Sequence, residues 1–227
     1  MHAKLKNLIS DLAPPIILRG ASAMFASKHH ATAGTEQVGE KGAEWYDASF
    51  DACEHWSQHY SESEYYFLWS VIADRIARSN ARSVLEIGCG TGQLACVIRD
   101  RIGCRYRGFD FSEKRIEYAQ KTYPDISFVR QDAFATDLFE ACDYDTVICT
   151  EFLEHVELDT VVLGKIRTGS RFYGTVPNFP FVSHVRHFGD EDEVRARYES
   201  HFRDLHVDTF LADAHGKAFY LLDGEVT

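Results

Sequence analysis

Short apolar runs alternate with helix-like segments between residues 83 and 176. The runs predict buried parallel strands, because strands covered on both faces are apolar almost throughout. They lie at residues 84–87, 106–110, 126–131, 144–150 and 171–176. The segments between them carry apolar residues every three to four positions, which predicts helices that lie on a sheet. This alternation is typical of right-handed βαβ units.

The end of the chain follows a different pattern. Acidic residues at 190–193 predict the start of a helix, because negative charge is favourable at a helix N-terminus. Residues 206–212 and 218–223 alternate apolar and polar side chains, and the His215-Gly216 turn between them predicts a hairpin. Together the strands predict an α/β fold, a doubly wound, seven-stranded, mostly parallel sheet with an antiparallel C-terminal hairpin.

The residues before the sheet divide into two parts. Residues 1–43 are expected to form an N-terminal arm or linker, and composition predicts a mobile linker or lid at 21–43. Residues 44–80 are expected to form an aromatic helical cap, with a helix at about 62–79 that docks on the main domain. That domain is expected to span residues 81–227.

Composition narrows the range of partners. The formal net charge is −11 and no basic run offsets it, so phosphate backbones would be repelled and nucleic acid is not an expected partner. The apolar stretches are too short for a membrane-spanning helix, which needs about 18 residues or more. The six cysteines form no C-x-x-C pair, which is typical of reduced thiols in a cytoplasmic protein.

Three glycines separate the first strand from the first helix. Gly88, Gly90 and Gly92 predict a tight turn in which the backbone touches a ligand, because glycine has no Cβ. A dinucleotide-binding turn reads G-x-G-x-x-G. Gln93 stands at the third glycine position of that pattern, which disfavours a dinucleotide site. An acidic residue, Glu86, stands two positions before the first glycine.

Acidic residues follow the predicted strands at the edge where open parallel sheets bind ligands. Asp110 ends the second strand, where a carboxylate accepts both hydroxyls of an adenosine ribose, and Phe111 suits the adenine face. Asp132 follows the third strand and can accept the adenine amine, while the backbone N–H of Ala133 can donate to a ring nitrogen. A turn aspartate is the alternative for Asp132. Residues 151–155 leave the fourth strand at the same edge.

Together these features resemble the motifs of class I S-adenosylmethionine (SAM) dependent methyltransferases, over about residues 60–227. Residues 86–92 match the pattern E-x-G-x-G-x-G, and residues 151–155 are similar to the E-x-L-E-H segment of ubiquinone-type methyltransferases. The resemblance implies a Rossmann-like fold and SAM as the cofactor. It implies cofactor contacts for Glu86, Gly88, Cys89, Gly90, Gly92, Gln93, Asp110, Phe111, Asp132, Ala133 and Glu151.

Polar groups on the loops at this edge are candidates for catalysis. His155 is the first candidate for a general base, and orientation of its loop by a buried imidazole is the alternative. His184 is the second candidate base. Expected substrate contacts are Tyr46, Tyr60, Asn178 and Arg186. Asn178 resembles a pocket asparagine of related enzymes. Arg186 could hold a substrate anion or only fix its loop. For Tyr46 and Tyr60 the alternative is a place in the core, because densely spaced aromatics are most often core residues.

The sequence therefore predicts a SAM-dependent methyltransferase of a small molecule or sugar, with O-methylation before N-methylation. Residues 11–17 are similar to the start of methyltransferases from bacterial surface-polysaccharide clusters, which suggests that pathway or secondary metabolism. No metal is expected, because Asp145 starts a strand and so lies at the wrong edge. The alternatives are an NAD(P)-binding oxidoreductase and a non-catalytic SAM-binding protein. The sequence is also compatible with a homodimer.

Overall fold

The computed structural model describes residues 38–227. The predictions for residues 1–37, including the resemblance at residues 11–17, lie outside this range. Among the described residues, no helix has the length and apolar character needed to cross a membrane.

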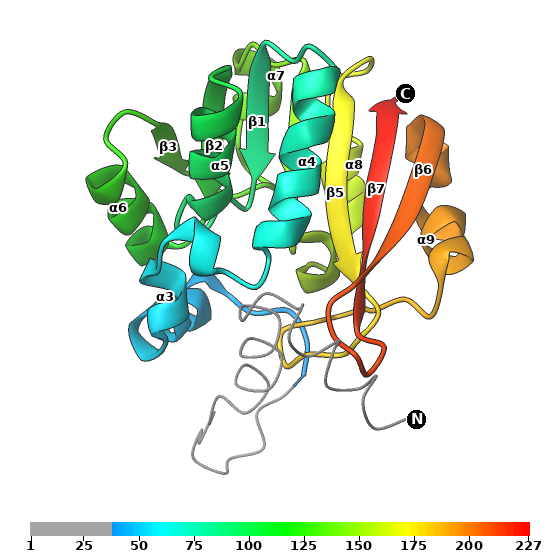
Figure 1. The fold of residues 1–227 in the computed structure, drawn as a ribbon, viewed down its shortest axis with the longest axis horizontal. Coiled ribbons are helices and arrows are strands. Elements are labelled where there is room, and N and C mark those ends of the chain that lie inside the picture. Colours follow the sequence, from blue (N-terminus) through cyan, green and yellow to red (C-terminus); the bar gives the residue numbers. More distant parts are fainter. Residues whose placement is uncertain (1–37) are drawn as a thin grey trace, which may run out of the picture.

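A seven-stranded sheet forms the centre of the molecule, with the strand order β3-β2-β1-β4-β5-β7-β6 (Figure 1). The strands are β1 (Ser83–Ile87), β2 (Arg105–Asp110), β3 (Ser127–Arg130), β4 (Thr146–Cys149), β5 (Arg171–Pro177), β6 (Phe202–Leu211) and β7 (Ala218–Val226). The first five strands run parallel, and β7 pairs antiparallel with both β5 and β6. The predicted sheet, including its hairpin, is confirmed.

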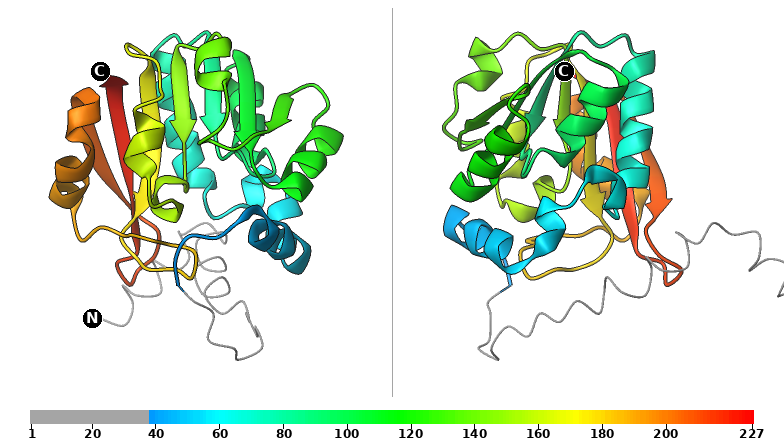
Figure 2. Two further views of the ribbon diagram at one scale, coloured as in Figure 1. Left: turned by 180° about the vertical axis from the view of Figure 1, so that it is seen from behind. Right: turned by 60° about the vertical axis from the view of Figure 1, so that its left-hand side comes forward.

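Helices cover both faces of the sheet (Figures 1 and 2). The α-helices are α3 (Ala43–Ala52), α4 (Tyr66–Arg78), α5 (Gln93–Arg101), α6 (Glu113–Thr122), α7 (Leu138–Ala141), α8 (Asp159–Leu163) and α9 (Glu191–Tyr198). The 3-10 turns are η1 (Glu54–Ser57), η2 (Tyr60–Glu62), η3 (Leu153–His155) and η4 (Glu199–His201). Helices α4 and α5 pack in one apolar cluster, and α7, α8 and α9 pack in another on the opposite face.

Helix α4 begins later than the predicted residue 62, because the 3-10 turn η2 precedes it. The hydroxyl of Ser63 accepts a hydrogen bond from the backbone N–H of Tyr65 at 3.3 Å, just before the helix. Leu68, Ile72 and Ile76 are almost fully buried against the sheet. Each buried aliphatic side chain contributes about 1.5–3 kcal/mol, so this stripe anchors the helix firmly.

Strand β6 begins before the predicted residue 206. Phe202 pairs with Val226 at its start, and the register then shifts between Arg203 and His206. The shift interrupts the two-residue period of a strand, so the apolar–polar pattern predicted only the part of β6 after it.

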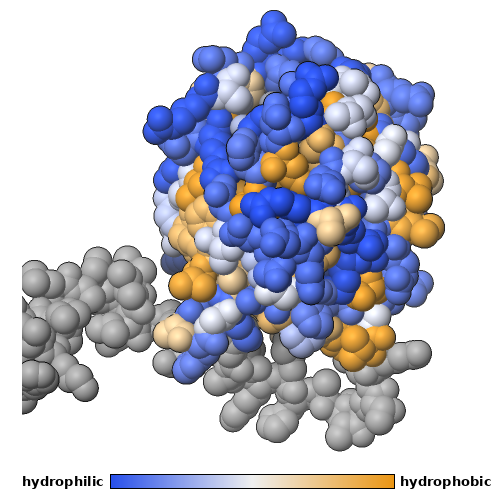
Figure 3. Space-filling model, turned by 90° about the vertical axis from the view of Figure 1, so that its right-hand side faces the viewer, coloured by the Kyte–Doolittle hydropathy of each residue, from blue (hydrophilic) through white to orange (hydrophobic). Residues whose placement is uncertain are grey.

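The molecular face on this side of the sheet is mostly hydrophilic, with hydrophobic residues in small groups (Figure 3).

Candidate functional site

A cavity of about 480 Å³ lies at the edge where the parallel strands end, between the sheet and α3. It lies where open parallel sheets bind their ligands. Eight of the predicted site residues line it: Tyr46, Gly88, Asp110, Phe111, Asp132, Ala133, Glu151 and His155. A cavity of about 550 Å³ lies at the opposite edge, and its lining, within the described part of the chain, holds no predicted site residue. The structure therefore brings these eight residues together at one edge of the sheet, and their contact with a ligand stays a prediction.

The glycine turn has the backbone conformation that its sequence predicts. Gly90 has a φ of +53°, and a Cβ there would meet no atom within 4 Å, so the need for glycine is conformational. Gly88 has a φ of +70°, and a Cβ there would lie 2.8 Å from the ring of Phe152. The turn is thus closely packed at Gly88 and open at Gly90, and the backbone at Gly90 is accessible.

Asp110 links this turn to the end of β2. Its carboxylate accepts hydrogen bonds from the backbone N–H groups of Gly90 at 3.0 Å and Ser112 at 2.8 Å. Burial raises the pKa of Asp110, and the guanidinium of Arg115 opposes that change. The carboxylate lines the cavity and is positioned by the backbone on both sides, so its remaining acceptor capacity can receive hydroxyl groups.

Arg115 is a cavity-lining residue that the sequence did not reveal. Its guanidinium lies 4.9 Å from the ring centre of Tyr46 and 4.2 Å from that of Trp56. It also donates to the hydroxyl of Ser49 at 3.0 Å. A single arginine in the first turn of a predicted helix carries no signal of this role, because its partners are far away in sequence.

Helix α3 covers the cavity through polar and aromatic contacts. The ring of Tyr46 lies 5.3 Å from that of Phe111 and 6.0 Å from the imidazole of His155. The carboxylate of Asp47 accepts hydrogen bonds from the Ser112 hydroxyl and the Lys114 N–H at the start of α6. None of the residues of α3 is buried, so little apolar surface holds this helix in place. These contacts are typical of a cover that can open.

Glu151 and Asp132 line two other sides of the cavity. Glu151 has a φ of +50°, an unusual conformation that clusters at functional sites. The hydroxyl of Thr175 donates to its carboxylate at 2.9 Å, and burial raises the pKa of Glu151 to about 7. Asp132 accepts the backbone N–H of Phe134 at 2.8 Å, so it has the turn role that was its alternative as well as its place in the cavity.

Several residues of the first motif lie behind the cavity rather than in its lining. Glu86 is buried and accepts a hydrogen bond from the Tyr106 hydroxyl. The side-chain amide of Gln93 donates to the carbonyl of Gln58 at 2.9 Å and so holds the cap beside the glycine turn. The motif residues outside the lining are Glu86, Cys89, Gly90, Gly92 and Gln93. Their contact with a cofactor stays a prediction.

Three predicted substrate contacts have other partners in the structure. The Tyr60 hydroxyl donates to Asp100 of α5 at 2.9 Å, away from the cavity. Asn178 bonds the hairpin, donating to the carbonyl of Gly216 at 2.9 Å and accepting the N–H of Ala218 at 2.8 Å. Neighbouring elements thus occupy the polar groups of both side chains, and their contact with a substrate stays a prediction.

Arg186 is the third of these residues. Its guanidinium donates to the carbonyl oxygens of Leu153, Val156 and Glu157 and lies 3.1 Å from the buried carboxylate of Asp159. It therefore fixes its loop, as the alternative interpretation has it, and contact with a substrate anion stays a prediction.

The two candidate bases lie side by side but only His155 lines the cavity. Their ring centres are 4.9 Å apart. Burial lowers the pKa of His155 to about 3, with smaller effects from His184 and Arg115. A neutral imidazole has the lone pair that a base needs, but so low a pKa makes it a weak base near neutral pH. His184 lies behind it and does not line the cavity.

Known proteins resemble this chain over its sheet-forming part. Residues 84–168 match the family model described as a methyltransferase domain. The ubiquinone biosynthesis O-methyltransferase of Paracidovorax citrulli (strain AAC00-1) is 35% identical over 88 residues, covering 37% of this chain and 37% of that protein. The (S)-tetrahydroprotoberberine N-methyltransferase of Eschscholzia californica is 26% identical over 122 residues, covering 50% of this chain and 33% of that protein. The chain thus spans little more than a third of the length of these curated relatives.

Solved structures show a similar fold at low sequence identity. The magnesium protoporphyrin IX methyltransferase ChlM of Synechocystis PCC 6803, with bound S-adenosylhomocysteine (SAH), has a TM-score of 0.63 at 16% identity. The similarity covers 82% of this chain and 98% of that one. It confirms the predicted Rossmann-like fold.

Proposed function

We propose that this chain is a class I SAM-dependent methyltransferase, with SAM as the cofactor, and that it methylates a hydroxyl oxygen of a small molecule or sugar. The observation that carries the proposal is the cavity at the strand ends, lined by Gly88, Asp110 and Ala133 on one side and by Tyr46 and His155 on another. The match of residues 84–168 to a methyltransferase domain favours methyl transfer over an NAD(P)-dependent oxidoreductase.

The residues at this edge suit an adenosyl group. Asp110 would accept the ribose hydroxyls, since its carboxylate is already oriented by two backbone N–H groups. Phe111 and the Asp132-Ala133 segment would contact the adenine, and the open space at Gly90 would let the backbone approach the amino-acid end. The cavity volume of about 480 Å³ falls in the range of small-molecule sites.

Catalysis would rest mainly on orientation. The bound sulfonium supplies a methyl group as an activated electrophile. The acceptor oxygen forms the new C–O bond while the C–S electron pair stays with sulfur, and the hydroxyl proton leaves for solvent or a base. Positioning two reactants can supply about 7–11 kcal/mol. The rings of Tyr46 and Phe111 would exclude water from the site.

Hydroxyl rather than amine acceptors are proposed because of the E-x-L-E-H segment, which is similar to that of ubiquinone-type O-methyltransferases. A cellular role in surface-polysaccharide or secondary-metabolite synthesis is proposed on the resemblance at residues 11–17. A strongly negative surface supports a small acceptor over nucleic acid. These finer statements concern the acceptor only and leave the cofactor assignment unchanged.

The test is an assay of SAH formation by the purified full chain, with SAM and a panel of hydroxylated sugars, phenols and matched amines. We expect SAH to form with at least one hydroxylated compound and the methyl group to be found on oxygen. Transfer to the amines alone would contradict the proposal. SAH release without any acceptor is the background to subtract, and binding of SAH without turnover on any compound would favour a non-catalytic protein.

A further inference from the structure

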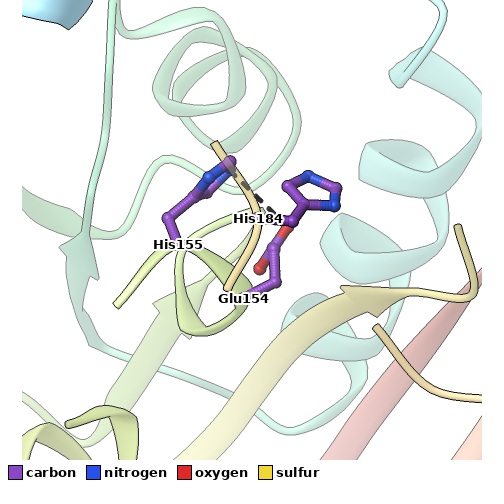
Figure 4. A group of neighbouring side chains, drawn as sticks. All are labelled: Glu154, His155 and His184. Carbon is purple, nitrogen blue, oxygen red and sulfur yellow. Dashed lines mark ion pairs between the residues drawn. The ribbon is translucent and has the colours of Figure 1, made fainter. Parts of the chain in front are cut away.

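A buried carboxylate and two imidazoles meet beside the cavity (Figure 4). Glu154 and His155 belong to η3, and His184 comes from the loop after β5. One ligand atom from each lies within 4.8 Å of the others, and His155 Nε2 lies 3.8 Å from Glu154 Oε1. Two segments distant in sequence therefore bring three groups of metal-binding type together.

The carboxylate of Glu154 has no exposed surface, and no N–H or O–H group of the described residues donates a hydrogen bond to it, although the carboxyl group of Glu151 lies within hydrogen-bonding reach. An uncompensated buried charge costs several kcal/mol. Burial and the neighbouring carboxylate of Glu151 raise the pKa of Glu154. This group therefore needs either a proton or a cation beside it.

Each histidine has one ring nitrogen that no carbonyl oxygen occupies. His155 Nδ1 lies 3.0 Å from the carbonyl oxygen of Ser183, and His184 Nδ1 lies 3.1 Å from that of Phe179. Since a carbonyl oxygen can only accept, each Nδ1 carries the proton and each Nε2 is free to coordinate. A backbone carbonyl that receives the other ring N–H is the usual support of a metal-binding histidine.

We propose that Glu154, His155 and His184 bind one divalent first-row transition-metal ion, with Zn²⁺ as the expected occupant. Two imidazoles and one carboxylate are a known catalytic zinc set, and imidazole favours such ions over Mg²⁺ or Ca²⁺. Ligand atoms at about 2.0–2.2 Å from one ion lie roughly 3–4 Å apart. The cluster already has one separation in that range, and a small inward movement of the side chains completes it.

The site has a use that rests on the proposed function. Of the three proposed ligands, His155 lines the cavity, so an ion held there would lie next to the space for the acceptor. An ion there would lower the pKa of an acceptor hydroxyl that it binds, so that the proton leaves to solvent before the oxygen attacks the methyl carbon. In this proposal His155 acts as a ligand of the ion and not as a general base. The sequence alone predicted no metal, because spacing cannot reveal that His184 folds back onto η3.

The test is calorimetric titration of the metal-free full chain with ZnCl₂, and of the same protein with CoCl₂ while the visible absorption of Co²⁺ is recorded. The matched variants are Glu154→Gln and His184→Gln. The control is His187→Gln, which changes an exposed histidine of the same loop. We expect the two cluster variants to lose about 100-fold or more in affinity for one ion, since even supporting residues of metal sites cost 10–100-fold. The control should keep wild-type affinity.

Wild-type affinity in Glu154→Gln would overturn the proposal and identify Glu154 as a protonated, purely structural carboxyl. Failure of the folded wild-type chain to bind either ion would overturn it too. Circular dichroism checks that each variant is folded. If both unfold, the wild-type chain still decides, because Zn²⁺ must shift the imidazole NMR signals of His155 and His184. Titration of the same samples with SAH keeps this outcome separate from the proposed function, since either ligand can bind without the other.

Discussion

Asp110 gives the sharpest test of the cofactor site. Its carboxylate is 8% exposed and accepts two backbone N–H groups. A hydrogen bond to a charged group contributes about 1.5–3 kcal/mol, so loss of the bonds to two ribose hydroxyls removes about 3 kcal/mol or more. Asp110→Ala should therefore weaken SAH binding by about 150-fold. Isothermal titration calorimetry of the full chain with SAH measures this directly.

Two further variants separate ligand binding from loop support. Asp110→Asn keeps one acceptor oxygen, which can still receive the N–H of Gly90 or Ser112, so we expect an intermediate loss of about tenfold. Asp143→Ala removes an exposed carboxylate at the opposite edge, where it pairs with Arg105, and should leave SAH affinity unchanged. Wild-type affinity in Asp110→Ala would refute the placement of the ribose.

Three other perturbations have expected outcomes. Gly90→Val should abolish SAH binding while circular dichroism stays native, because φ is +53° but no atom lies near the new Cβ; native affinity would contradict the loop assignment. In Arg186→Ala, buried Asp159 keeps its bonds to Arg197 and Tyr198, but three backbone carbonyl oxygens lose their donor, so the free energy of unfolding in urea should fall by about 2 kcal/mol while SAH affinity is kept. A specific loss of acceptor turnover in a stable protein would instead support the substrate role. In the metal-free protein, burial lowers the pKa of His155 to about 3, so the folded state binds a proton less readily than the unfolded state. Acidification from pH 6.5 to 5 should therefore lower the free energy of unfolding of the wild type by about 2 kcal/mol relative to that of His155→Gln. Parallel stability curves for the two proteins would show that the pKa of the buried imidazole is ordinary.

The sequence predicted those parts of the molecule that depend on local patterns. The parallel direction of β1 to β5 follows from repeated strand–helix units, and Gly88 and Asp110 lie at the edge that parallel topology requires. The binding of Gln93 to the cap could not be predicted, because its partner Gln58 is distant in sequence and lies in an irregular segment. The sequence could not decide between the two roles of Arg186 for the same reason, since its carbonyl partners belong to η3 and the residues after it.

In the cap, the sequence could not predict which aromatic side chain faces the cavity. Both Tyr46 and Tyr60 belong to an aromatic-rich segment, and composition cannot separate them. The structure places Tyr46 over the cavity beside Phe111, whereas Tyr60 bonds Asp100 on the outer side of α5. Which aromatic faces the site depends on the path of the chain through η1 and η2, and no periodic pattern marks that path.

A crystal structure of the full chain with SAH would test the central claim most directly. The account predicts ribose hydroxyls at about 3 Å from the Asp110 carboxylate. It also predicts the adenine beside Ala133 and the sulfur directed toward His155. SAH bound instead in the cavity at the opposite edge, or with its ribose away from Asp110, would contradict the account.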